Sequence, residues 1–387
     1  MRQSGITHPI RSPVTIAAGL VLGAGVTWNI ANVGAIAGPL SVSYGVSLAA
    51  VGLLATALFV THLLVQIPGG RLIDRIGARS VGLAALAVVA AGNAVALTAP
   101  SLGVGLAART LMGIGTGVGF VAGIDLVRSG SGGPFWQGMY GGATMAAGGL
   151  SLMIVPQLVG TLGWRTPYWT GLVLAIAAAL PVLAARRTAV SRHAGAQEAL
   201  GRGVVGDRRL WPLGAVQMAT FGLSVVAGNW IVTLLEREGH GRSVSGVVGG
   251  LVLFAGIVTR PAGGLVMRRA PGRAWALVTV SLVAGSAGVL LLAAAPPLWL
   301  AAIAALVVGL AAGFPFASVF DMTLRHRPDA PAAAVGFVNG SAVLVILVCT
   351  PLAGLTFSLP GDGRLAFLVI GLLWATALLA VRKAART

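Results

Sequence analysis

Long stretches without any charged side chain constrain this chain more than any other feature. Residues 12–70, 135–164, 274–320 and 330–361 contain no Asp, Glu, Lys or Arg. Each stretch is long enough for one or two membrane spans of about 20 apolar residues. Only 9% of the 387 residues are charged and 57% are hydrophobic, whereas soluble domains carry about 25% charged residues. The sequence therefore predicts an integral membrane protein.

The net charge of +17 does not indicate a nucleic-acid partner. The basic residues lie between the apolar runs, where membrane topology accounts for them. The single cysteine, Cys349, lies inside an apolar run and indicates neither a disulfide framework nor a metal cluster. The apolar run from Val14 to Ala37 is too long for the core of a signal peptide, so we expect an uncleaved first span. The expected partners are the lipid bilayer and a small-molecule substrate, with no metal and no cofactor.

The apolar runs, divided by Gly, Pro and charge, predict twelve transmembrane helices. Backbone groups in hydrocarbon must be satisfied within their own segment, which favours helices. The alternating ten-residue segments of a membrane barrel are missing from the sequence. The expected spans are roughly 13–38, 45–69, 80–99, 101–125, 135–160, 165–186, 209–235, 243–267, 274–294, 297–321, 331–355 and 362–382.

The distribution of basic residues predicts the orientation. Twenty of the 26 Lys and Arg residues fall in loops on the side of the termini, four fall on the other side, and Arg109 and Arg260 lie within spans. By the positive-inside rule, both termini are expected in the cytoplasm, in a multi-pass protein of the inner (plasma) membrane. The longest polar connection predicts an N-terminal six-helix bundle (1–186), a cytoplasmic linker (187–208) and a C-terminal six-helix bundle (209–387).

The two halves are related by an internal repeat with an offset near 195 residues. Parallel six-helix repeats are a known plan for transporters, in which the substrate binds near the midplane and rocking of the halves gives alternating access. The matching residues are Gly113, Gly117 and Asp125 with Gly309, Gly313 and Asp321, and Gly69-Gly70 with Gly263-Gly264.

Two motifs carry a family resemblance. Gly70-Arg71-Leu72-Ile73-Asp74-Arg75-Ile76-Gly77-Ala78-Arg79, between predicted spans two and three, resembles the cytoplasmic loop signature of the major facilitator superfamily (MFS). The segment Arg109-Thr110-Leu111-Met112-Gly113-Ile114-Gly115 is similar to the span-four motif of that superfamily. The resemblance implies the MFS fold, an all-α membrane protein with twelve transmembrane helices in two six-helix parallel repeats, and a monomeric secondary transporter. Ala78 stands where the family usually has a basic residue, and the second-half copy has Arg268 in place of the aspartate.

The loop signature also implies a cytoplasmic gate. The resemblance implies that Asp74 latches the two halves in the outward-open state, and that Asp125 receives a loop arginine. A carboxylate at the end of a bundle is stabilised by a helix N-terminus and by neighbouring guanidinium groups; a solvated loop charge is the alternative. Asp321 is expected to contact Arg325 or the Arg268–Arg269 pair. The candidate gating residues are Gly70, Asp74, Arg75, Gly77, Arg79, Asp125 and Asp321.

The substrate cavity is expected to be positive. Arg109 and Arg260 lie within spans, and charged residues there usually face the bundle interior or a water-filled cavity. No Asp or Glu falls in the middle of any predicted span. Guanidinium groups without carboxylates favour anions through bidentate contacts and disfavour lipophilic cations. Arg260 is close enough to the cytoplasmic end to snorkel, so a gate or interface role stays open for it.

Several polar and aromatic side chains inside spans are further candidates for substrate contact. Each is equally consistent with a hydrogen bond between packed helices. Among them, His62 is a candidate proton carrier because histidine titrates near neutral pH; a neutral histidine bonded to a neighbouring helix is the alternative. The candidates are Asn29, Asn32, His62, Gln66, Gln217, Asn229, Trp230 and Asn339.

A last motif bears on the substrate. Arg260-Pro261-Ala262-Gly263-Gly264 is similar to the span-eight motif of the nitrate/nitrite porters within the superfamily. That family uses a second arginine in span two, where this sequence has Gln66, and its Gly- and Asn-rich span-five signature is missing here. We therefore expect a small inorganic or organic anion, of cyanate or carboxylate type. The alternative is a drug or metabolite exporter of the proton-antiporter type. No catalytic Ser-His-Asp order or phosphate loop occurs in the sequence, so an enzyme is not expected.

Overall fold

The computed structural model describes residues 12–130, 133–186 and 203–384. These residues form helices and connecting turns, without a strand. The helices of the first half are α1 (Pro13–Ala31), α2 (Ala37–Tyr44), α3 (Leu48–Leu64), α4 (Gln66–Ile76), α5 (Ala78–Ala96), α6 (Leu102–Ser129), α7 (Pro134–Gln157), α8 (Val159–Leu162) and α9 (Thr166–Ala184). The helices of the second half are α11 (Leu210–Gln217), α12 (Ser224–Arg237), α13 (Arg242–Arg269), α14 (Ala274–Ala293), α15 (Leu298–Gly313), α16 (Pro315–His326), α17 (Pro331–Leu355) and α18 (Arg364–Ala384).

The number of membrane spans agrees with the sequence. Among the described residues, 11 helical segments are long and apolar enough to cross a membrane, and a twelfth is obtained if α3 and α4 form one span bent by 48°. Several spans are made of two consecutive labelled helices, such as α11 with α12 and α15 with α16. The all-α membrane fold with twelve predicted spans is therefore confirmed. Most of the predicted linker (residues 187–202) lies outside the described residues.

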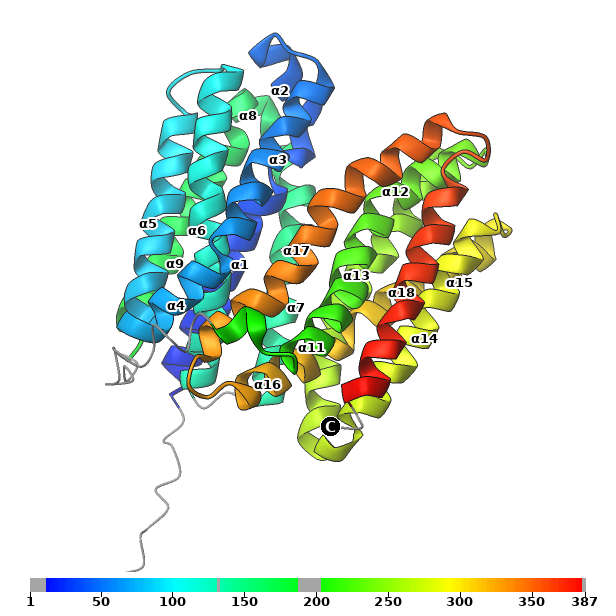
Figure 1. Cartoon of the computed structure of the whole chain (residues 1–387). Helices are drawn as coiled ribbons and strands as arrows, with labels where there is room; N and C mark the ends of the chain where they lie inside the picture. The colour runs from blue at the N-terminus through cyan, green and yellow to red at the C-terminus, as the bar shows by residue number, and fades with distance from the viewer. Residues whose placement is uncertain (1–11, 131–132, 187–202, 385–387) are drawn as a thin grey trace, which may run out of the picture.

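The helices gather into two bundles (Figure 1). Helices α1 to α9 pack on one another, and so do α11 to α18. The start of α1 and the end of α18 lie at the same end of the molecule, and the two bundles are close together at that end and diverge toward the other (Figure 1). We call the end with α16 and the termini the terminal face, and the opposite end, with α2, the distal face.

The most extensive contacts between the bundles are those of α4 with α17 and of α7 with α13. Glycine makes both approaches possible. A Cβ atom added at Gly70 of α4 would lie 2.6 Å from Cα of Ala333, and one added at Gly264 of α13 would lie 2.8 Å from Cα of Phe135. Since real Cβ atoms do not approach backbone this closely, the two halves meet here through glycine. Gly70 and Gly264 are the repeat-related pair found in the sequence.

The segment predicted as a loop between spans two and three is mostly helical. Residues 70–76 belong to α4, and α5 begins at Ala78. Only Gly77 separates the two helices, and its φ of +89° is a conformation that glycine adopts without a steric penalty. The signature residues therefore have fixed positions at the terminal face.

Candidate substrate cavity and gate

A cavity of about 340 Å³ lies between the two bundles. Its walls come from α1, α3, α6 and α7 of the first half and from α12, α13 and α17 of the second. Most of its lining is apolar, and no lining residue is acidic. The polar side chains that line it are Thr27, His62, Thr144, Asn229, Arg260 and Asn339.

Arg260 of α13 is the one charged residue that lines this cavity. It is 3% exposed. Its Nη1 donates to the carbonyl of Gly141 at 3.2 Å and to Oγ1 of Thr144 at 3.5 Å, both on α7, while its Nε has no hydrogen-bond partner. The guanidinium carbon lies 4.3 Å from the ring centre of Phe316 and 5.3 Å from that of Phe221. A buried guanidinium with an unused donor, between two aromatic rings, is suited to hold an anion.

Arg109 of α6 does not line the cavity. Its guanidinium is buried within the first bundle and is occupied by backbone carbonyls. Nη1 donates to the carbonyl of Asn29 at 2.6 Å, Nη2 to that of Ile30 at 3.2 Å and Nε to that of Leu54 at 3.2 Å. These bonds tie α6 to α1 and α3, so the structure separates the two arginines that the sequence analysis grouped in one cavity.

Asn29 and Asn32 also bind helices together rather than facing the cavity. The Asn29 amide donates to Gly25 and accepts a 2.7 Å bond from Asn93. The Asn32 amide donates to the carbonyl of Pro167 at 2.7 Å. Both belong to the alternative that the sequence left open, hydrogen bonds between packed helices.

Gln66 and Trp230 likewise lie outside the cavity lining. Gln66 is 1% exposed, and neither its side-chain oxygen nor its nitrogen has a hydrogen-bond partner. The Trp230 indole donates to the carbonyl of Thr350 at 2.9 Å and stacks on Phe357 with ring centres 5.1 Å apart. Gln217 is buried with an unbonded side-chain nitrogen.

The remaining candidates, His62, Asn229 and Asn339, do line the cavity. His62 is 3% exposed, and its Nδ1 lies 3.0 Å from Oγ1 of Thr116. The structure thus brings His62, Asn229, Asn339 and Arg260 together around one space. The hydrogen bond to Thr116 agrees with the alternative of a histidine bonded to a neighbouring helix, while the position at the cavity is what a proton carrier requires.

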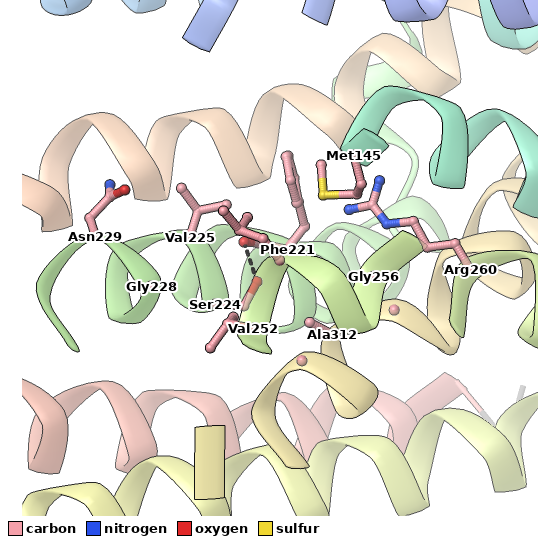
Figure 2. A pocket seen from close by; sticks show the side chains of 13 residues that line it. Met145, Phe221, Ser224, Val225, Gly228, Asn229, Val252, Gly256, Arg260 and Ala312 are labelled. Carbon is pink, nitrogen blue, oxygen red and sulfur yellow. Dashed lines mark hydrogen bonds between the residues drawn. The ribbon is translucent and has the colours of Figure 1, made fainter. Parts of the chain in front are cut away.

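A side pocket of about 80 Å³ opens next to Arg260, between α12, α13 and α15. Figure 2 shows Arg260 at one end of this pocket and Asn229 at the other, with Met145 of α7 beside the guanidinium. The chain is locally π-helical over Met218–Leu223, immediately before the part of α12 that lines the pocket. Such turns insert an extra residue into a helix and occur often at functional sites.

Asp74 joins the halves at the terminal face. Its two carboxylate oxygens accept from the backbone N–H groups of Ala332 and Ala333, both at 3.0 Å. These N–H groups belong to the first turn of α17, which has no partners of its own for them and carries a partial positive charge. Asp74 of the first half therefore caps a helix of the second half, as a latch requires.

Three other gating candidates, Arg79, Asp125 and Asp321, make contacts within their own halves. Arg79 donates to the carbonyl of Leu183 at 2.7 Å, at the end of α9. Asp125 pairs with Arg128 at 2.6 Å, and Asp321 pairs with Arg325 at 2.8 Å. Arg75 is exposed at the end of α4. Of the two contacts expected for Asp321, the structure shows the one with Arg325. Within the described residues, no group of three or more His, Cys, Asp or Glu side chains is arranged to hold a metal ion.

The comparisons with known proteins agree with this architecture. The family model described as Major Facilitator Superfamily matches residues 17–344. The chain belongs to this superfamily. As a member of it, this protein is a membrane transporter and not an enzyme. No curated protein sequence gives a significant match to it.

Solved MFS structures share the fold at low sequence identity. A variant of the E. coli fucose:proton symporter FucP has a TM-score of 0.78 and 15% identity, covering 97% of this chain and all (100%) of that one. FucP in the outward conformation has a TM-score of 0.77 and 14% identity, covering 96% of this chain and 99% of that one. The human organic anion transporter MFSD10 (TETRAN) has a TM-score of 0.67 and 16% identity, covering 96% and 100%. These likenesses concern the fold alone.

The sequence analysis of this MFS transporter missed the residues around Arg260. Thr144 and the carbonyl of Gly141 hold the guanidinium, and Phe221 and Phe316 flank it. The aromatic residues in two other spans were a usable signal, because a guanidinium group is attracted to the face of an aromatic ring. No sequence signal identifies a backbone carbonyl as a ligand.

Proposed function

We propose that this transporter carries a small organic or inorganic anion across the membrane by alternating access, with Arg260 as its anion contact. The observation that carries the proposal is the unpartnered Nε of a buried arginine in a cavity without a carboxylate. An arginine buried without a counter-ion is costly, and an anionic substrate offsets that cost when it binds.

A single arginine narrows the substrate class. The nitrate/nitrite porter pattern uses two arginines, but here Gln66 occupies the second place and Arg109 is occupied by carbonyls. One planar guanidinium binds one carboxylate or a similarly shaped anion through two parallel hydrogen bonds. We therefore favour anions with one such group over nitrate itself.

Alternating access is supported by the two interfaces at the terminal face. We infer that this face is cytoplasmic, in a monomer of the inner membrane whose cavity is here closed on that side. Opening it requires the Asp74 cap on α17 to break and the glycine contacts at Gly70 and Gly264 to separate. The two bundles are close together at the terminal face and diverge toward the other end (Figure 1), which supports an outward-facing state.

The anion proposal is tested by thermal stabilisation of the purified transporter with formate, acetate, benzoate, nitrate and lipophilic cations. We expect the wild-type protein to be stabilised by anions, Arg260→Gln to show no such effect, and Arg260→Lys to show a weakened one because the planar fork is lost. Stabilisation by cations alone, or by anions equally in wild type and Arg260→Gln, would contradict the proposal. The first of those results favours the proton-antiporting exporter.

We also propose that His62 couples transport to protons, because it is a titratable group facing the cavity. The test is substrate uptake into proteoliposomes at several external pH values. His62→Gln is expected to transport without the pH dependence of the wild type. Thr116→Val removes only the partner of Nδ1 and is expected to keep that dependence. An unchanged pH profile in His62→Gln would exclude this role.

A further inference from the structure

We propose that the side pocket beside Arg260 is a subsite for the apolar chain of the substrate, which makes the transported anion a monocarboxylate with a short alkyl chain. The inference rests on the proposed function, because it takes Arg260 as the carboxylate contact. It adds a second binding element, the pocket of about 80 Å³ that α12, α13 and α15 line together with Met145 of α7.

The geometry connects the two elements directly. Arg260 lines both the main cavity and the side pocket. Its Nη1 is directed to α7 by the Gly141 carbonyl, whereas its buried Nε lacks a partner. A carboxylate held at this guanidinium extends its chain along the pocket, past Val225 and Val252 toward Asn229 (Figure 2).

The pocket exists because of small residues and a helix irregularity. The π-helical turn at Met218–Leu223 interrupts the regular side-chain spacing just before the lining part of α12. At Gly228 an added Cβ would meet only Val252 Cγ1, at 3.8 Å. No neighbouring side chain fills the space next to Gly228, so the pocket depends on the absence of a side chain at this position.

The chemistry of the lining selects an apolar guest. Apart from Arg260, the polar side chains there are Ser224 and Asn229. The Ser224 hydroxyl already donates to the carbonyl of Phe221 at 2.9 Å, and Asn229 lies at the end away from the guanidinium (Figure 2). A volume of 80 Å³ corresponds to about five to eight carbon atoms if each occupies the room of one water-sized group. Inorganic anions leave this volume empty.

The experiment is a chain-length series of carboxylates bound to the full-length transporter in lipid nanodiscs, measured by calorimetry. Acetate, butyrate, hexanoate, octanoate and decanoate are titrated, and empty nanodiscs are subtracted to remove partition into lipid. We expect affinity to rise about fourfold per methylene group that enters the pocket and to level off near hexanoate. Gly228→Val adds apolar volume to the pocket at a place where an added Cβ meets only Val252 Cγ1, at 3.8 Å, so it is expected to bring hexanoate to the affinity of acetate.

Gly246→Val is the matched control. Gly246 lies on α13, and an added Cβ there meets nothing within 4 Å, so the chain-length profile is expected to stay that of the wild type. If acids bind through Arg260 but with one affinity for every length, or if Gly228→Val leaves the profile unchanged, the subsite is disproved and the anion proposal stands. If no acid binds, or if Arg260→Gln binds them equally, the proposed function fails and the subsite with it.

Discussion

The two interfaces that join the halves are alike in backbone and different in charge. At the α4–α17 interface, Gly70 allows close approach and the Asp74 carboxylate caps the first turn of α17. At the repeat-related α13–α7 interface, Gly264 allows the same approach. Arg268 occupies the place of the carboxylate there, with its guanidinium carbon 5.4 Å from the ring centre of Phe135.

The second interface has its polar connection deeper in the membrane. Arg260 of α13 donates to the Gly141 carbonyl of α7, next to the cavity. An anion bound at Arg260, as we propose, would therefore act directly on the α7–α13 interface. The Asp74 carboxylate that caps α17 at the other interface does not line the cavity. We infer a division of roles: α4–α17 keeps the terminal face closed, and α7–α13 responds to the substrate.

The largest expected effect on the closed terminal face comes from the two glycine contacts. They test the feature that the two interfaces share, the close approach of backbone. Gly70→Ala and Gly264→Ala each place a Cβ against backbone that has no side-chain freedom to move away. We expect each substitution to disfavour the closed terminal face by about 3 kcal/mol or more, the upper range for overpacking. The measurement is the distance between spin labels at Ile76→Cys and Val205→Cys in a Cys349→Ala background, which should lengthen.

The control for this pair is Gly103→Ala, because a Cβ at that position meets nothing within 4 Å. It is expected to leave the label distance unchanged. A lengthened distance in only one of the two glycine variants would show that the interfaces are not equivalent in packing.

The next largest effect comes from the charged residues Asp74 and Arg268. They test the feature in which the two interfaces differ. Asp74→Asn removes the charge from two hydrogen bonds to backbone N–H groups and leaves one acceptor, so we expect a cost of about 1.5–3 kcal/mol for the closed state. Arg268→Asn changes the corresponding position without removing a cap. We therefore expect the fraction of molecules with a lengthened label distance to rise less than a tenth as much as in Asp74→Asn. Equal shifts in the two variants would mean that α4–α17 is not the stronger closure.

The sequence marked residues of both interfaces without predicting which helices they join, and it predicted the cavity only in part. The glycine pairs and the exchange of aspartate for Arg268 follow from the repeat, and the latch role of Asp74 was implied by the loop signature. The repeat says nothing of which helix face a side chain occupies. Arg109 and Arg260 therefore looked alike, since each is a lone arginine in an apolar span.

What separates the two arginines is tertiary. Arg109 finds the carbonyls of Asn29, Ile30 and Leu54, which become available only when α1, α3 and α6 are packed. The carbonyls near the end of α1 are free because a helix leaves its last carbonyls without partners. Sequence spacing does not encode which arginine meets them, so the unpaired donor of Arg260 was visible only in the structure.

The smallest expected effect is on the pH dependence of stability. It concerns Arg327 and Asp329, which lie just before the first turn of α17 that Asp74 caps. Arg327 donates to Asp329 at 2.7 Å and to Asp207 at 3.4 Å. The hydrogen bond from Arg327 holds the pKa of Asp329 below its ordinary value despite partial burial. Desolvation acts to raise the pKa of Asp207, but the N–H of Arg209, His326 and Arg327 together lower it. Both carboxylates therefore stabilise the fold above their ordinary pKa of about 4, and that contribution is lost as pH falls through the lowered values.

We expect the wild-type protein to lose about 1 kcal/mol of stability from this cluster as pH falls from roughly 5 to 3, a small amount because the carboxylates are partly exposed. Melting temperatures over that range measure it, with Asp329→Asn expected to have a lower melting temperature at pH 6 and a shallower fall in acid. The His326 imidazole lies 3.1 Å from Asp207, and this pair is common to both proteins, so the comparison with Asp329→Asn isolates the Asp329 part. An equal fall in both proteins would show that the Asp329 carboxylate contributes nothing to this acid-dependent stability.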